Sequence, residues 1–99
     1  MRQSRLDKQV ERSLVALMEA EEAEKVLSEQ VDTWSEIRDD LRTRALVSET
    51  PLAQAEAQDA ARHARAQEAQ RDDLVRSIRQ LETEQDALLD QMAAEMSGS

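Results

Sequence analysis

The segment Ser48-Glu49-Thr50-Pro51 is the one place where this 99-residue sequence interrupts a helical pattern. Thr50 carries a side-chain oxygen suited to capping a helix, and Pro51 fits the first helical position, where a backbone N–H has no partner in any case. On both sides of the segment, apolar residues recur at three- and four-residue spacing. The segment therefore predicts a turn between two long helices, over residues 4–48 and 51–96, with Gly98 just beyond the second.

The composition also favours long helices over a compact globular core. The chain has one Gly, one Pro, no Cys, and Trp34 as its single aromatic residue, while charged residues make up 35% of it. Without Phe or Tyr, the hydrophobic fraction of 39% contains too little bulk to fill a globular interior. Enrichment in Ala, Glu, Gln, Leu and Arg is typical of helices that pack as coiled coils. We therefore expect an all-α protein.

Heptad positions, lettered a to g, can be assigned on both sides of the turn. The a and d positions of the first helix are Leu6, Val10, Ser13, Leu17, Ala20, Glu24, Leu27, Val31, Trp34, Arg38, Leu41 and Ala45. Those of the second helix are Ala53, Ala57, Ala60, Ala64, Gln67, Arg71, Leu74, Ile78, Leu81, Gln85, Leu88 and Met92. Because the phase does not continue through Pro51, one straight rod is disfavoured.

Folding the second helix back on the first brings every a layer opposite a d layer. Leu6 then faces Met92, Trp34 faces Ala64, and Leu41 faces Ala57, so that large side chains meet small ones near the turn. The sequence thus predicts an antiparallel coiled-coil hairpin, with its turn near residues 48–51, that forms a single domain over residues 1–99.

Several layers of the predicted seam contain polar residues. Ser13 and Gln67 are examples, and the acidic Glu24 lies one layer away from the basic Arg71. Glu24 and Arg71 would either form a buried ion pair or both extend to water, and the pattern leaves these two alternatives open.

Two groups of apolar residues lie off the seam and predict an interface. The group toward the open end of the hairpin comprises Leu14, Val15, Met18, Val75, Leu89 and Met96, and the group at the turn comprises Leu46, Val47 and Leu52. A two-helix hairpin buries only one stripe per helix and is marginally stable by itself. We therefore expect one group to bind another protein or a second copy of the chain.

The sequence offers no catalytic, cofactor-binding or metal-ligating residues. His63 is the only histidine, and Asp59 one turn before it does not complete a ligand set. Adjacent acids such as Asp39-Asp40 point in different directions around a helix, whereas acid–base catalysis needs convergent groups. Gly-rich phosphate loops and nucleophile motifs are absent from the sequence. We therefore expect a protein that is not an enzyme and binds no cofactor. The alternative, an enzyme subunit whose active site is completed by residues of a partner protein, is not supported by any residue of this sequence.

Charge and hydropathy limit the classes of partner. The chain has 22 acidic and 13 basic residues, for a net charge of −9, and Trp34 is the only side chain suited to stacking on bases, so nucleic-acid binding is disfavoured. The apolar run Leu14–Met18 is too short for a signal peptide or a membrane span. The lack of Cys fits a reducing compartment. These features predict a cytoplasmic protein without membrane insertion.

Three stretches carry a resemblance to a known family: Leu17–Leu27, with Ala20 and Ala23 among glutamates, Trp34–Arg38, and Arg71–Leu89. They resemble the FliJ/YscO group, the central-stalk coiled-coil hairpins of flagellar and virulence type III secretion. The resemblance implies a bacterial protein-transport component that contacts the secretion ATPase and escort chaperones, and it transfers no individual functional residue. The alternative is an acidic helical regulator or inhibitor that binds a basic protein partner.

Overall fold

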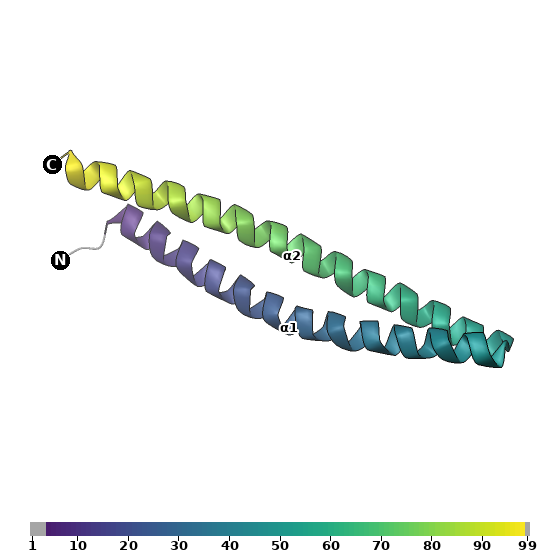
Figure 1. Ribbon diagram of the computed structural model, residues 1–99. Helices are drawn as coiled ribbons and strands as arrows, with labels where there is room; N and C mark the ends of the chain where they lie inside the picture. Colours follow the sequence, from purple (N-terminus) through teal and green to yellow (C-terminus); the bar gives the residue numbers. More distant parts are fainter. Residues whose placement is uncertain (1–3, 99) are drawn as a thin grey trace. The chain divides into compact units, whose positions relative to one another are not determined.

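The chain folds into two long helices joined by a short link (Figure 1). The computed structural model describes residues 4–98, of which α1 covers Arg5–Ser48 and α2 covers Pro51–Ser97. No strand occurs within these described residues, and the two helices contact each other. The predicted all-α helical hairpin and its turn are therefore confirmed, with helix ends within one residue of those expected.

Side-chain caps begin both helices. At the start of α1, the Ser4 hydroxyl accepts a hydrogen bond from the Asp7 backbone N–H at 3.0 Å, and the Asp7 carboxylate accepts one from the Ser4 N–H at 3.3 Å. At the start of α2, the Thr50 hydroxyl accepts the Ala53 N–H at 3.1 Å, directly before Pro51 at the first helical position. These bonds satisfy backbone donors that have no partner inside a helix, and they confirm the predicted role of Thr50.

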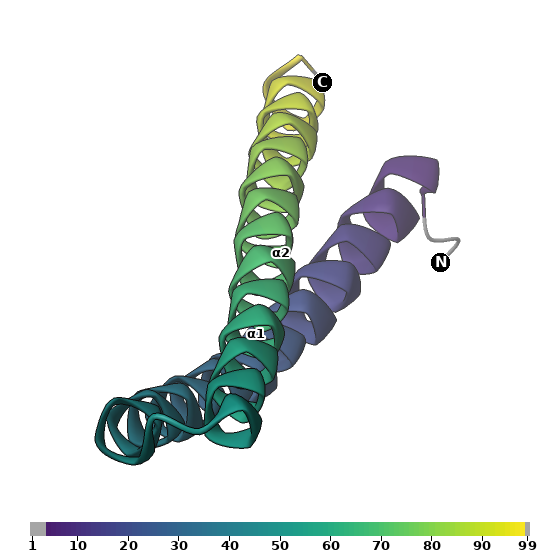
Figure 2. The same cartoon turned by 90° about the vertical axis from the view of Figure 1, so that its right-hand side faces the viewer.

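Glu49 ends α1 by leaving the helical conformation. Its φ of 53° lies in the left-handed region, and it is the only non-glycine residue with positive φ in the described chain. The Glu49 N–H still donates to the Ala45 carbonyl at 3.0 Å, which closes the last turn of α1. The chain then reverses between Glu49 and Pro51 (Figure 2). A residue with a side chain thus occupies a position that usually favours glycine.

The described chain divides into two compact units, and both helices pass through each unit. Unit 1 combines the residues up to Ala23 with those from Leu74 onward, and unit 2 is the segment Glu24–Asp73, which contains the turn. Unit 1 buries Leu6 and Leu17. Unit 2 buries Val31, Ala60 and Ala64. Each of the two units therefore has its own buried cluster.

The assigned seam matches the observed burial. Every assigned a and d residue is buried or half-buried, and all five fully buried residues occupy these positions. In unit 2, the Trp34 ring lies 3.8 Å from the His63 ring, centroid to centroid, and the neighbouring Ala64 is 0% exposed. In unit 1, Leu6 and Leu88 line the same hollow. The Trp34–His63 contact lies one residue from the predicted pairing of Trp34 with Ala64, and Leu88 lies one turn before Met92, the predicted partner of Leu6.

The polar seam residues are incompletely satisfied. The buried Ser13 hydroxyl oxygen and the buried Gln67 amide oxygen have no hydrogen-bond partner in the described chain. The Glu24 carboxylate accepts a hydrogen bond from the Ser28 hydroxyl at 3.0 Å and forms no ion pair with Arg71. The ion-pair alternative is therefore wrong, because the local Ser28 hydroxyl satisfies Glu24 without bringing a second charge into the seam.

Replacing the residue at the turn provides a first test of this description. We expect Glu49→Gly to raise the free energy of unfolding by about 1 kcal/mol, because glycine adopts positive φ without the steric cost of a Cβ. Urea denaturation followed by circular dichroism measures the change. The control Glu36→Gly, in the interior of α1, should lower stability by about 1 kcal/mol. A loss of stability in Glu49→Gly would contradict the left-handed conformation at the turn.

A second test concerns the unsatisfied amide in the seam of unit 2. Gln67→Met keeps the length of the side chain and removes the buried polar atoms, so we expect a gain of about 1–3 kcal/mol in the free energy of unfolding. The control Gln70→Met changes an exposed residue three positions later and should stay within about 0.5 kcal/mol of the parent. Destabilisation by Gln67→Met would show that the amide has a partner.

Candidate functional site

The first candidate surface lies in unit 1, beside the seam. Position e of the heptad directly follows d, and by the register Leu14 of α1 and Leu89 of α2 occupy e positions on the same side of the seam. The facing e residue of Leu14 is Glu82, and that of Leu89 is Asp7. Leu14 and Leu89 are 45% and 44% exposed, whereas the flanking seam residues Leu17 and Leu88 are buried or half-buried. We call the exposed apolar group Leu14, Val15, Met18, Leu89 and Met96 the unit 1 patch.

Val75 contributes less to this surface than the sequence indicated. It also occupies an e position of α2, but it is half-buried. A helix with apolar residues at a, d and e has an apolar stripe that is wider than the a/d stripe buried between two helices. In bundles of more than two helices, the additional e residues pack against a further helix. The unit 1 patch therefore has the position of a second packing seam.

The second candidate surface is the tip patch, formed by Leu46, Val47 and Leu52 in unit 2. These residues flank the turn and are 74%, 82% and 70% exposed, among the most exposed large apolar side chains described. Three aliphatic side chains at one turn form a small surface whose backbone contains the left-handed Glu49. Both predicted groups are thus exposed, apart from Val75.

Two exposed apolar residues of unit 2 were not among the predicted interface residues. Val26 and Ile37 are exposed on α1, at a c and a g position. Both are apolar residues at heptad positions outside the a/d seam, and this pattern could have identified them from the sequence. Val26 lines a hollow of about 320 Å³ with Glu29, Gln30 and Thr33, and Trp34 closes that hollow.

Trp34 also borders a second hollow of about 320 Å³, which lies between the two helices of unit 2. Leu41 of α1 and Ala60 of α2 contribute apolar walls, and the polar residues Glu56, Asp59 and His63 complete its lining. The indole and imidazole planes of Trp34 and His63 are inclined by 38°. The predicted core residue Trp34 is only half-buried, so part of its ring remains available at the surface.

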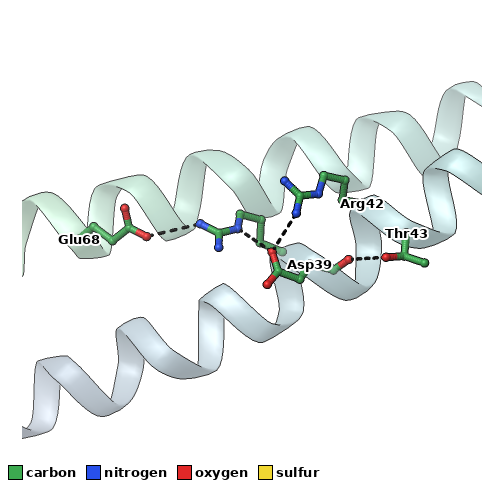
Figure 3. Close-up of polar contacts among 5 residues, drawn as sticks. Asp39, Arg42, Thr43 and Glu68 are labelled. Atoms are coloured by element: carbon green, nitrogen blue, oxygen red, sulfur yellow. Dashed lines mark hydrogen bonds and ion pairs between the residues drawn. The ribbon is translucent and has the colours of Figure 1, made fainter.

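Arg38 organises the charged side chains of unit 2 (Figure 3). Its guanidinium donates to Glu68 of α2 at 3.4 Å and to Asp39 at 3.1 Å, and Arg42 donates to the same Asp39 carboxylate at 3.4 Å. The Thr43 hydroxyl donates to the Asp39 carbonyl at 3.0 Å. These side chains are partly exposed, so each ion pair contributes at most about 1 kcal/mol. The cluster ties α1 to α2 and presents no pair of convergent carboxylates.

Across residues 4–98, no three His, Cys, Asp or Glu side chains are grouped so that they could hold a metal ion. Neither α1 nor α2, as far as they are described, has an apolar stretch long enough to cross a membrane. The arrangement gathers apolar side chains with charged neighbours, which are the components of protein interfaces. Comparison of the chain with protein-family models, curated proteins and solved structures finds no match in any of the three.

Proposed function

We propose that this chain is a non-enzymatic helical-hairpin protein that binds another protein through the unit 1 patch. The observation that carries the proposal is the exposure of Leu14 and Leu89 at e positions on the same side of the seam. Because the two residues come from different helices and flank one seam, they form the centre of a surface on which a further helix can pack. Val15, Met18 and Met96 extend this surface along both helices.

The accessible surface of the chain supports this proposal. The chain exposes 7597 Å² at a mass of 11.2 kDa. A folded monomer of that mass exposes about 5,700 Å². The excess, about 1,900 Å², is more than twice the roughly 800 Å² that each partner buries in an interface of standard size. A single partner of ordinary size would therefore cover less than half of this excess.

The unit 1 patch is the better interface of the two candidates. Its residues project from regular helical backbone, which fixes their positions before a partner arrives and lowers the entropic cost of binding. The tip patch offers only Leu46, Val47 and Leu52 around a turn. We therefore assign the principal interface to unit 1.

The more specific proposal is a cytoplasmic stalk or adaptor of a bacterial type III secretion apparatus, with the secretion ATPase, an escort chaperone or a second copy as the partner. It is supported by the helical hairpin together with the resemblance of Leu17–Leu27 and Arg71–Leu89 to the FliJ/YscO group. The alternative, an acidic regulator of a basic protein, is supported by the net charge of −9 and the acidic lining of the Trp34 hollows.

The double variant Leu14→Gln/Leu89→Gln tests the principal interface. Each substitution removes apolar surface without changing the charge, so we expect at least tenfold weaker association, on the order of 1.4 kcal/mol or more. The measurement is chemical cross-linking in the host cell, followed by quantification of the cross-linked complex and identification of its members. Sedimentation of the purified chain separates binding to a second copy from binding to another protein.

The matched control is the tip double variant Leu46→Gln/Leu52→Gln, which makes the same chemical change at the other patch. It should retain the complex that the unit 1 variant loses. Equal retention by both variants would refute the assignment to unit 1, and a complex without any secretion component would refute the secretion role.

A further inference from the structure

Trp34, the only tryptophan of the chain, separates two hollows whose linings share one chemical character. Each hollow combines apolar side chains with carboxylates, Glu29 in one hollow and Glu56 with Asp59 in the other. No Lys or Arg lines either hollow. Both hollows lie within unit 2; residues of α1 alone line the hollow that contains Glu29, whereas α1 and α2 both line the other. We call this pair of hollows the Trp34 groove.

The carboxylates of the Trp34 groove are largely uncompensated. Asp59 forms an ion pair with Arg62, one turn further along α2. Glu29 and Glu56 form no ion pair within the described chain. Two free carboxylates beside apolar walls produce a negative potential at a surface that also excludes part of the surrounding water.

Such a surface matches a long basic side chain. The methylene stem of Arg or Lys packs on apolar walls such as those of Leu41 and Ala60, while its charged head reaches a carboxylate at the rim. The face of an indole ring attracts the same cation, and the guanidinium of Arg also stacks on it. The aromatic, aliphatic and acidic groups of the groove therefore all favour the same ligand, a long basic side chain such as Arg or Lys.

The distance between the two hollows indicates how far apart two basic residues of a partner protein would have to lie to occupy both. On α1, the residues of one hollow are centred near Gln30 and those of the other midway between Trp34 and Leu41. This separation corresponds to about 11 Å, or two helical turns. Side chains seven residues apart on a helix have the same spacing. We propose that the Trp34 groove binds an amphipathic helix of a partner protein that carries Arg or Lys at positions i and i+7.

This inference rests on the proposal that the hairpin binds proteins, but it concerns a surface separate from the unit 1 patch. The experiment uses the full chain and a helical peptide of Leu and Ala with Arg at i and i+7, and it follows the emission of Trp34 during titration. We expect a saturable change in emission, with affinity that falls as salt is raised because the charges are exposed. A peptide with Gln in place of both Arg residues should bind about tenfold more weakly.

Variants of the chain locate the bound peptide. Glu29→Gln/Glu56→Gln should weaken binding of the Arg peptide about tenfold. The control Glu19→Gln/Glu36→Gln removes the same charge from exposed residues outside the groove and should change affinity less than about twofold. Trp34→Leu keeps an apolar residue in the seam, and calorimetry should show weaker binding of the Arg peptide to it. Circular dichroism verifies that each variant remains helical.

Three results would overturn the proposal. They are equal affinity of the Arg and Gln peptides, equal weakening by the two glutamine double variants, and loss of peptide binding in Leu14→Gln/Leu89→Gln. The first would show that the groove does not recognise charge, the second that only net charge matters, and the third that the peptide binds to unit 1. Failure of the complex in cells with retained peptide binding would reject only the unit 1 interface.

Discussion

Every buried side chain of the described residues lies at an a or d position of the seam, and the remaining features depend on how few large side chains the seam buries. Unit 2 buries Val31 with Ala60 and Ala64, and unit 1 buries only Leu6 and Leu17. Alanines allow α2 to approach Trp34 and Leu41 closely, but they contribute little apolar area of their own. The hairpin therefore has a well-defined register without a large core, and many of its bigger aliphatic side chains remain at the surface.

The seam was predictable because heptad spacing depends only on the geometry of a helix. All assigned a and d residues are at least half-buried, and Thr50 caps α2 as its position before Pro51 indicated. Side-chain conformations were less predictable, since local alternatives compete at similar energies. Glu24 accepts a hydrogen bond from Ser28 on its own helix, although Arg71 lies in a neighbouring layer. The Trp34 ring lies against His63, and Trp34 borders two hollows although it was predicted to face Ala64 in the seam.

The two units differ in the chemistry beside the seam, and this difference separates the candidate surfaces. Positions e carry Leu14 and Leu89 in unit 1, whereas Glu68 at an e position of unit 2 accepts a hydrogen bond from Arg38. Unit 1 therefore offers apolar area, which provides affinity in proportion to the surface covered. The Trp34 groove of unit 2 offers charge next to an aromatic ring, which provides selectivity for cationic side chains.

A thin seam also couples binding to folding. The unsatisfied Gln67 amide and the left-handed Glu49 each cost about 1–3 kcal/mol, a considerable part of the stability of a small domain. A partner that binds only the folded hairpin at a concentration of 100 times its Kd adds about 2.7 kcal/mol of stability. The partner thereby offsets a large share of these costs, because it covers apolar surface that the seam cannot reach. Under the proposed function, the interface would help to keep the helices paired, and residues outside the seam would contribute to folding as well as to recognition.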